Sequence, residues 1–376
     1  MMNEKMKRIV IDDMFLTTGR ATVASSKMLD GYQSLIDAEV LLRAKAAGYV
    51  LYGIAPAGEF GIDLLGETAA GGAYIQNGTL KNLSAQTLLW NDATAALCFD
   101  VNGYPRRAAA QTGLVCLKPT YGAISREGVV SVAPSGETVD ILARDVQECR
   151  ELFCAVAEEK KEKCAPIRRV AVLTSLQDDV NKEAKQKIDT AVERLKNSEI
   201  SITYIENSII SASKAVWNVI LCAELCKNTA RYDGVRYGHR AEKFSTLEEL
   251  YTTSRTEGFG DLIKAAILYG SEVLSSENYQ KIYEKALRVR RVIAEEFAKL
   301  FEQFDAFLLP ACSSMVYAEE QLKTDKYVAF EENRFTAPAS LTGLPAVVAG
   351  YVQLIGKANS EHALLDIAKI LAGEAE

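Results

Sequence analysis

Apolar and polar positions alternate along the chain in a way that predicts strands and helices in turn. Arg8–Ile11 is a short run of β type, residues 36–48 place Ile36, Val40 and other apolar side chains at helical spacing, and residues 48–53 form a second apolar run. This strand–helix–strand order predicts an α/β fold whose sheet is at least partly parallel. Residues 61–80 are rich in glycine, which indicates an irregular loop.

The same alternation continues after a charged connector at residues 157–169. The patterns there predict, in chain order, a strand at 170–173, a helix at 182–196, a strand at 200–205, helices at 211–230 and 278–304, a buried strand at 307–310, a tight antiparallel pair at 347–348 and 352–355, and a closing helix at 360–371 with Ser360 as its N-cap. We therefore expect one domain over residues 1–376, in which segments 1–156 and 170–376 are joined by the surface linker 157–169.

Composition agrees with a globular chain that has a large core. Of the 376 residues, 48% are apolar and 25% are charged, and 43 basic against 50 acidic side chains give a net charge of −7. No long basic run is present, so direct nucleic-acid binding is not expected. The first eight residues lack an apolar leader segment, and no uncharged apolar run reaches the roughly 18 residues of a membrane span. The expected compartment is the cytoplasm, with no membrane partner.

Eight cysteines are scattered along the chain without a C-x-x-C pair. Cys222 and Cys226 lie one turn apart on a predicted helix, but the chain has only two histidines, His239 and His362. Buried apolar thiols explain these cysteines better than a zinc site does. We expect neither a metal nor a cofactor.

Several short motifs carry a family resemblance, and they occur in the order that the family has. They are Ala24–Leu29 (ASSKML), Leu117–Gly122 (LKPTYG) within 116–130, Ala230–Gly238 (ARYDGVRYG), Thr253–Gly260 (TSRTEGFG), Thr336–Pro338 (TAP) and Thr342–Ala346 (TGLPA). Together they resemble the amidase signature family, and within it most closely the A subunits of glutamyl-tRNA(Gln) amidotransferases. The resemblance implies an α/β/α sandwich around a large mixed sheet. Relative to that family the chain is N-terminally and C-terminally shortened, with only residues 349–351 joining the last two strands.

The family's chemistry needs three residues that this chain lacks. By the resemblance, a serine nucleophile passes its proton through a second serine to a neutral lysine. The lysine position falls on Asp12, the relay serine on Leu80 and the nucleophile on Tyr104. A carboxylate has the wrong charge and a shorter reach, leucine has no proton to pass, and a phenol of pKa about 10 is bulky and a poor acyl acceptor. The family triad is therefore predicted to be degenerate, with no catalytic residue retained.

The glycines that shape the family's two catalytic loops are also mostly lost, since only Gly78 and Gly103 remain. Two alternatives keep a chemical role open. Ser84 or Thr79 with Lys81 as base would be a rebuilt nucleophile, although solvated loop residues are the simpler interpretation. Asp12 with Asp13 would be a new carboxylate pair, although neighbouring strand residues point to opposite faces.

The resemblance also implies where a substrate would be held. Arg290 falls at the position of an arginine that holds the donor's α-carboxylate, and a guanidinium suits a carboxylate. Asn333 replaces an aspartate that would receive the α-amino group, and Arg231 and Tyr237 belong to a segment that lines the family's cleft. Internal ion pairs and packing would explain the arginines and Tyr237 equally well.

Three functional hypotheses follow. The first is a catalytically inactive family member that acts as a scaffold, regulatory or binding subunit, with a protein partner resembling the amidotransferase B or C subunits, an active paralogue, or a second copy of itself. The second is a protein that binds an amino acid or amide through Arg290. The third is an active amidase or amidotransferase subunit with a rearranged site.

Overall fold

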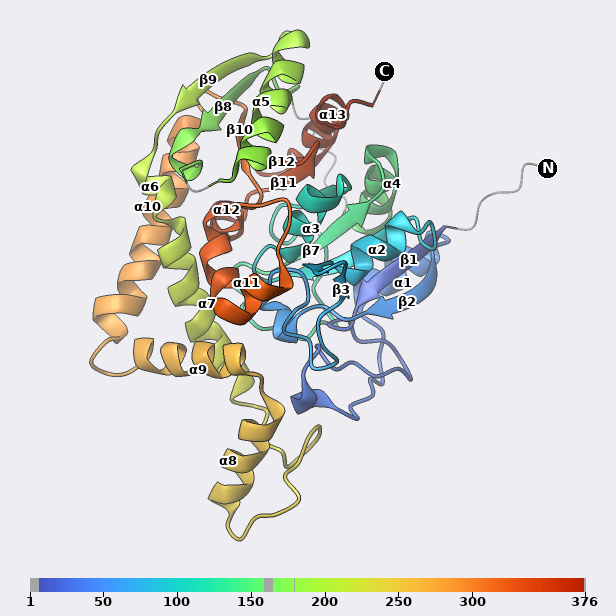
Figure 1. Cartoon of the computed structure of the whole chain (residues 1–376), viewed down its shortest axis with the longest axis vertical. Helices are drawn as coiled ribbons and strands as arrows, with labels where there is room; N and C mark the ends of the chain where they lie inside the picture. The colour runs from blue at the N-terminus through green and yellow to red at the C-terminus, as the bar shows by residue number, and fades with distance from the viewer. Residues whose placement is uncertain (1–6, 159–164, 179, 375–376) are drawn as a thin grey trace, which may run out of the picture.

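A ten-stranded mixed sheet forms the centre of the computed structural model, which describes residues 7–158, 165–178 and 180–374 (Figure 1). The strand order is β2-β1-β5-β7-β6-β11-β12-β10-β8-β9. The strands are β1 (Arg8–Asp12), β2 (Val50–Ala55), β5 (Ala95–Asp100), β6 (Val115–Lys118), β7 (Thr138–Ala143), β8 (Arg169–Leu173), β9 (Ser201–Ile205), β10 (Ala306–Pro310), β11 (Ala346–Ala349) and β12 (Val352–Gly356). Two short strands, β3 (Ile75–Gln76) and β4 (Thr79–Leu80), form a separate hairpin.

Both halves of the chain contribute to this one sheet. β1 runs parallel to β2 and β5. Across the sheet in the order β5-β7-β6-β11-β12-β10, each strand pairs antiparallel with its neighbour. The seam between the halves is the β6–β11 pair, where Leu117 lies opposite Val347. Central strands such as β5, β7 and β10 are buried at every position, which explains their near-continuous apolar sequence. The predicted connector is described only in part, because residues 159–164 lie outside the described residues.

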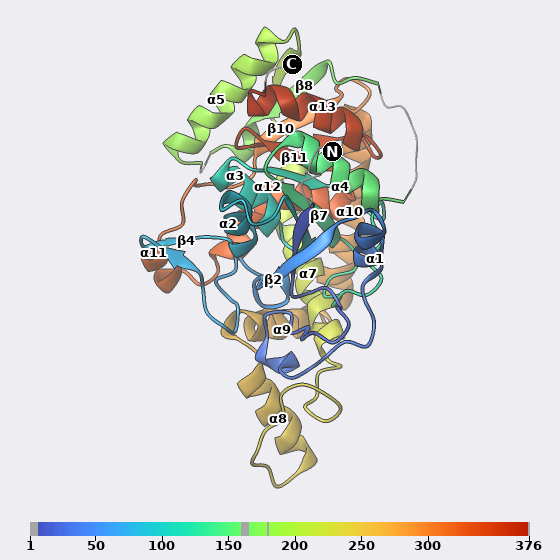
Figure 2. The same ribbon diagram turned by 90° about the vertical axis from the view of Figure 1, so that its right-hand side faces the viewer.

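Helices cover both faces of the sheet and confirm the predicted α/β/α layering (Figure 2). The helices are α1 (Glu39–Ala46), α2 (Leu83–Leu89), α3 (Tyr104–Thr112), α4 (Val146–Val156), α5 (Lys182–Asn197), α6 (Ser208–Ser211), α7 (Ser213–Thr229), α8 (Leu247–Gly258), α9 (Asp261–Val273), α10 (Glu284–Leu300), α11 (Glu319–Thr324), α12 (Val328–Thr342) and α13 (Glu361–Ala372). α2 and α3 pack on one face, whereas α4, α13 and α5 pack on the other. α7, α9, α10 and α12 form a further helical layer, from which α8 projects (Figure 1).

One described helical segment, Ser208–Thr229, is long and apolar enough by composition to cross a membrane. In this fold it belongs to α6 and α7, and α7 packs against α9, α10 and α12 with Trp217, Ile220 and Leu221 buried. Core packing of this kind explains its apolar composition.

Most predicted elements are confirmed, including the parallel β1–β2 pair and the β11–β12 hairpin. The predicted helix at 36–48 is too long. α1 begins only at Glu39, and Ile36 is 56% exposed. The preceding chain is held in a bend because the Ser34 hydroxyl donates to the carbonyl of Ile36, and the Asp37 carboxylate accepts the N–H of Thr18. The predicted helix at 278–304 is a π-type turn at Tyr279–Tyr283 followed by α10.

Candidate functional site

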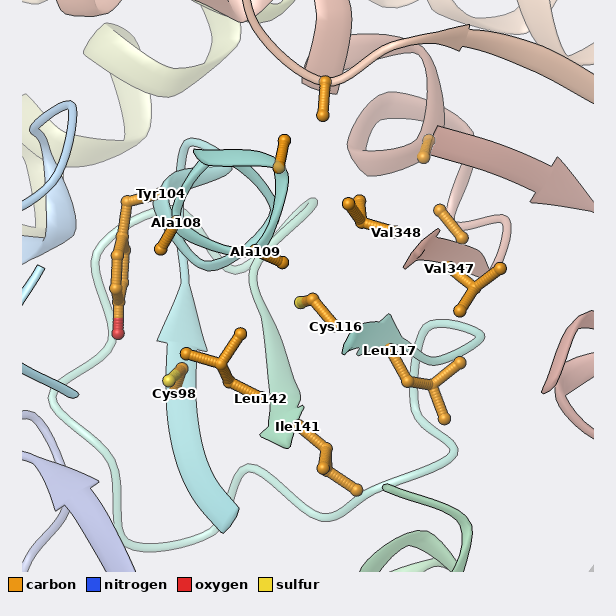
Figure 3. Close-up of a cluster of buried hydrophobic side chains, with 14 of the residues drawn as sticks. Cys98, Tyr104, Ala108, Ala109, Cys116, Leu117, Ile141, Leu142, Val347 and Val348 are labelled. Atoms are coloured by element: carbon orange, nitrogen blue, oxygen red, sulfur yellow. The ribbon is translucent and has the colours of Figure 1, made fainter. Parts of the chain in front are cut away.

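The three positions at which the resemblance places the family triad are all buried. Asp12 ends β1, Leu80 ends β4 and Tyr104 begins α3, with exposed fractions of 1%, 1% and 0%. The Tyr104 hydroxyl donates a hydrogen bond to the Asp12 carboxylate. Figure 3 shows the Tyr104 ring hanging from the first turn of α3, with its hydroxyl end on the side of Cys98. The structure thus brings Asp12 and Tyr104 into contact, and Leu80 lies in the same buried core.

The Asp12 carboxylate has three hydrogen-bond donors. Besides Tyr104, it accepts the backbone N–H of Phe99 at 2.7 Å and the Ser84 hydroxyl at 3.4 Å. Phe99 lies on β5, which pairs with β1, so the sheet register sets this geometry. Burial raises the pKa of Asp12 to about 7, and the three donors oppose that rise. Burial, reinforced by the charge of Asp12, also raises the pKa of Tyr104 well above its usual range. The phenol therefore stays protonated near neutral pH.

The lysine base predicted for a rebuilt Ser84 nucleophile is not in contact with it, and the hydroxyl instead faces the Asp12 carboxylate. Ser84 is 1% exposed and its hydroxyl points to Asp12. Lys81 is half-buried, and no hydrogen bond or ion pair among the described residues joins its ammonium to Ser84. The Thr79 hydroxyl is bonded to the carbonyl of Gln76 instead.

Asp12 and Asp13 use separate sets of partners, as the alternation of a strand requires. The Asp13 carboxylate accepts the backbone N–H and the hydroxyl of Ser25 at 2.6 and 2.8 Å, and the N–H of Ala57 at 3.4 Å. Burial raises the pKa of Asp13 to about 6. Its role is to hold the loop that contains Ser25.

Gly103, the glycine retained before Tyr104, is held tightly by α12. Its φ is +96°, and an added Cβ would lie 2.4 Å from the Thr336 side chain. Thr336 also donates its hydroxyl proton to the carbonyl of Asn102. One turn into α3, the buried Arg106 pairs with Asp100 at 2.9 Å and donates to the carbonyl of Thr336. These contacts clamp the first turn of α3 between β5 and α12.

The four residues predicted to bind substrate each have partners of their own within the protein. Arg290, half-buried on α10, donates Nε to the carbonyl of Leu341 at 2.7 Å and Nη2 to that of Ser135 at 2.8 Å. Arg231 is exposed and is bonded to Asn228 through both its Nε and its Nη2.

Tyr237 and Asn333 lie in other surroundings. Tyr237 packs against Tyr32 and Tyr232, with ring centroids 5.8 and 6.2 Å apart. Asn333 is fully buried on α12, where its amide donates to Asn218 at 2.8 Å. No contact among the described residues joins any two of the four.

A second group of carboxyls, in and just before the glycine-rich loop, escaped the sequence analysis because this segment has no periodicity. Glu59 is 3% exposed and Asp63 is fully buried, and neither oxygen of Asp63 has a hydrogen-bond partner among the described residues. Burial, followed by the charge of Glu67, raises the pKa of Asp63 well above its usual range. The only available signal was an unusual density of acids in an apolar loop. No group of three or more His, Cys, Asp or Glu side chains in the described part of the chain is arranged to hold a metal ion.

Comparison with known proteins gives the same result as the motifs. The family described as Amidase matches residues 91–365. The A subunit of the glutamyl-tRNA(Gln) amidotransferase from Symbiobacterium thermophilum is 33% identical over 96% of this chain and 81% of its own length. Its counterpart in a Streptococcus pneumoniae strain is 31% identical over the same shares.

Solved structures share the fold. A crystal structure of the A subunit of the glutamyl-tRNA(Gln) amidotransferase from Thermotoga maritima superposes with a TM-score of 0.79 at 24% identity, covering 98% of this chain and 83% of that one. A 6-aminohexanoate cyclic dimer hydrolase superposes with a TM-score of 0.80 at 19% identity, covering 98% and 84%. The match over most of the length and the shared fold establish that the chain belongs to the amidase signature family.

Proposed function

We propose that this protein is a catalytically silent member of its family that acts as a scaffold, regulatory or binding subunit in a protein complex. The observation that carries the proposal is the buried contact between Asp12 and Tyr104. It occupies the place where the resemblance puts a lysine base and a serine nucleophile.

The first support is steric. A nucleophile must approach a substrate carbonyl to within about 3–3.5 Å. Tyr104 and Leu80 are 0% and 1% exposed, and the Tyr104 ring fills the space beside α3 (Figure 3). Neither these residues nor Asp12 line any of the larger cavities found among the described residues. In this conformation the side chains of Tyr104 and Leu80 are therefore shielded from a substrate.

The second support is electrostatic. General-base catalysis requires a group that accepts the nucleophile's proton at working pH. Burial lifts the pKa of the Tyr104 phenol far above that range, and the neighbouring Asp12 carboxyl disfavours the phenolate further. Ser84, the nearest alcohol, is paired with the same carboxyl rather than with a lysine.

The predicted ligand role of Arg290 gains no support from its contacts. Two of its donors already bind the carbonyls of Ser135 and Leu341, so the guanidinium fastens the loop at Ser135 and the end of α12 to α10. A carboxylate ligand would have to compete with these bonds. We therefore favour an anchoring role for Arg290 over an amino-acid site.

A role in a complex is supported by the relatives and by the surface. The relatives are named as subunits, so they assemble with other chains. In this chain α8 projects from the body in both views (Figures 1 and 2). Large apolar side chains are exposed on it and on the adjoining α9. Leu247 is 60% exposed, and on the adjoining α9 Leu268 is 71% exposed. Exposed apolar surface of this kind favours protein partners.

An activity assay tests the first half of the proposal. The purified chain, alone and with B-type and C-type amidotransferase subunits, is given glutamine, asparagine and simple amides, and ammonia release is measured against a catalytically active relative. We expect no release above background. Activity that Ser84→Ala abolishes, while the exposed Ser271→Ala leaves it intact, would instead establish a rebuilt catalytic centre.

A binding experiment tests the second half. Tagged protein purified from its native cells is expected to carry a partner in fixed stoichiometry, measured by light scattering on a sizing column. Leu268→Glu on α9 is expected to release that partner. Leu35→Glu, which changes an equally apolar exposed residue before α1, serves as the matched control. A wild-type chain that stays a lone monomer contradicts the subunit role.

A further inference from the structure

A cavity of about 530 Å³ lies away from the Asp12–Tyr104 contact. The loop that begins at Glu59 forms one side, the start of α9 a second, and α11 with the start of α12 a third. Its size falls in the range of small-molecule sites in proteins.

The cavity has apolar walls and an acidic lining. Ile75, Leu262, Leu322 and Val328 supply much of the apolar surface. The charged lining residues are five acids and two lysines: Glu59, Glu67, Asp261, Glu319, Asp325, Lys323 and Lys326.

Both lysines are already paired at the rim. Lys323 pairs with Glu319 at 2.8 Å, and Lys326 pairs with Asp261 at 3.3 Å. Glu59 and Glu67 make no ion pair with a described residue, although the charge of Lys264 opposes the rise in the pKa of Glu59 and that of Arg107 opposes the rise in the pKa of Glu67. The Glu67 carboxylate also accepts the backbone N–H groups of Leu64 and Leu65.

Glu59 is the most enclosed of these acids. Its carboxylate accepts the Ser26 hydroxyl at 2.6 Å and the Gly260 N–H at 2.9 Å, and it makes no ion pair with a described residue. Burial raises its pKa to about 7. A buried acid without a counter-cation is costly, and a bound cation would relieve that cost.

The backbone beside Glu59 is also held in an unfavourable conformation. Phe60 has a φ of +52°, and Ala24 and Ser25, which precede the partner Ser26, have φ of +47° and +52°. Such φ values are rare for residues with a Cβ and gather at functional sites. The loop therefore holds Glu59 in a fixed position, in a backbone conformation that a relaxed turn would not adopt.

We propose that this cavity binds a small aliphatic amine, with the ammonium between Glu59 and Glu67 and the alkyl stem against Leu262, Leu322 and Val328. An anion is disfavoured by the acidic excess, and the described carboxyls are not arranged as a metal site. An ammonium suits the acidic part of the lining, and an alkyl stem suits its apolar part. The amine site does not use Asp12, Leu80 or Tyr104. A failure of the amine-binding test would therefore leave the proposed function unaffected, and the reverse also holds.

Calorimetric titration of the full chain with n-butylamine tests this site, with n-butyrate as the matched anion. We expect saturable binding of the amine and none of butyrate. Glu59→Gln is expected to weaken amine binding about tenfold, which corresponds to about 1.4 kcal/mol. Leu322→Trp, at a half-buried wall residue, is expected to abolish binding by filling the cavity while leaving the fold intact. Glu302→Gln, which neutralises an exposed acid outside the cavity, is expected to change nothing.

The proposal is overturned by either of two results. One is the absence of binding to the wild-type chain at millimolar amine. The other is binding of equal strength in the wild type and in Leu322→Trp, because that would mean attraction to the acidic surface in general. Since Leu322→Trp leaves the Ser26 and Gly260 contacts of Glu59 untouched, the test remains decisive even if Glu59→Gln does not fold.

Discussion

At the residue scale, Asp12 and Tyr104, which stand where the resemblance places two catalytic groups of the family, are complementary to each other. Asp12 and Tyr104 are 92 positions apart, yet the phenol of one donates to the carboxylate of the other inside the core. Each residue alone would be poorly placed there, because a buried acid and a buried phenol both need a hydrogen-bond partner. Together they form a packed, hydrogen-bonded contact at the position where the resemblance places the family's catalytic groups.

Tyr104→Phe is expected to lower the free energy of unfolding by about 1–3 kcal/mol, because it removes one donor from a buried carboxyl and leaves the ring in place. Urea denaturation measures the change. Tyr204→Phe, at a tyrosine 56% exposed on the edge strand β9, is the matched control and is expected to be neutral. Equal stability of Tyr104→Phe and the wild type would mean that the hydroxyl contact contributes nothing.

Asp63→Asn is expected to stabilise the protein at pH 8 but not at pH 5. The pKa of Asp63 is raised by burial, so ionising it in the folded state costs free energy that an amide avoids. The gain at pH 8 is on the order of 1 kcal/mol. Thermal unfolding of both proteins at the two pH values measures it, and a loss of stability at pH 8 would show that the carboxylate has an unseen favourable role.

At the scale of elements, the first turn of α3 is fixed by the approach of α12. The buried Arg106 joins Asp100 on β5, the carbonyl of Thr336 and the side chain of Gln353 on β12. Gly103 permits this approach because it has no Cβ. The clamp holds Tyr104 in the core.

Comparing two glycines separates backbone strain from crowding. Gly103→Ala is expected to cost clearly more stability than Gly78→Ala, although both have positive φ, +96° and +71°. At Gly78 nothing lies within 4 Å of an added Cβ, so only the left-handed backbone cost of about 1 kcal/mol applies. At Gly103 the Thr336 side chain must also move. Chemical denaturation of both variants provides the comparison, and similar losses would mean that α12 yields freely.

The elements themselves follow well from the sequence where periodicity is strong. The strands β8 and β9, the helix α5 between them and the β11–β12 hairpin agree with their predicted positions. The start of α1 was misplaced because side-chain bonds from Ser34 and Asp37, rather than apolar spacing, decide it.

The site was predicted only through the resemblance, and its contacts were not. Nothing local in the sequence relates Asp12 to Tyr104, because the register between β1 and β5 creates that contact. The resemblance predicts a substrate carboxylate at Arg290, and nothing in the sequence indicated that its donors also reach the carbonyls of Ser135 and of Leu341 on α12. Glu59 was missed because the segment that contains it has no periodicity to interpret.

At the scale of the whole molecule, buried acids outnumber buried bases around β1 and the loop after β2. Burial raises the pKa of Asp12 and of Glu59 to about 7, and that of Asp13 to about 6. A carboxyl whose folded pKa is raised stabilises the fold fully below its unfolded pKa of about 4, and this contribution is lost as pH rises through the folded pKa.

The melting temperature is therefore expected to fall between about pH 5 and pH 8, contrary to the usual acid sensitivity of proteins. Differential scanning calorimetry in buffers of equal ionic strength measures this dependence. The variant Asp13→Asn is expected to flatten it most near pH 6, the folded pKa of Asp13. A melting temperature that rises over the same interval would show that the buried acids ionise at no cost.

The clamp around Tyr104 also determines which single changes can lead back to the ancestral chemistry. Lysine at position 12 would place an ammonium against a phenol in a core that contains no space for it. Serine at position 104 would leave a void where the ring stood, at a cost of about 3–5 kcal/mol, and a carboxyl without its partner. Each of these single changes is therefore expected to lower stability. If the proposed loss of catalysis holds, neither change alone would restore activity, so the Asp12–Tyr104 pair would oppose a stepwise return to the family's chemistry.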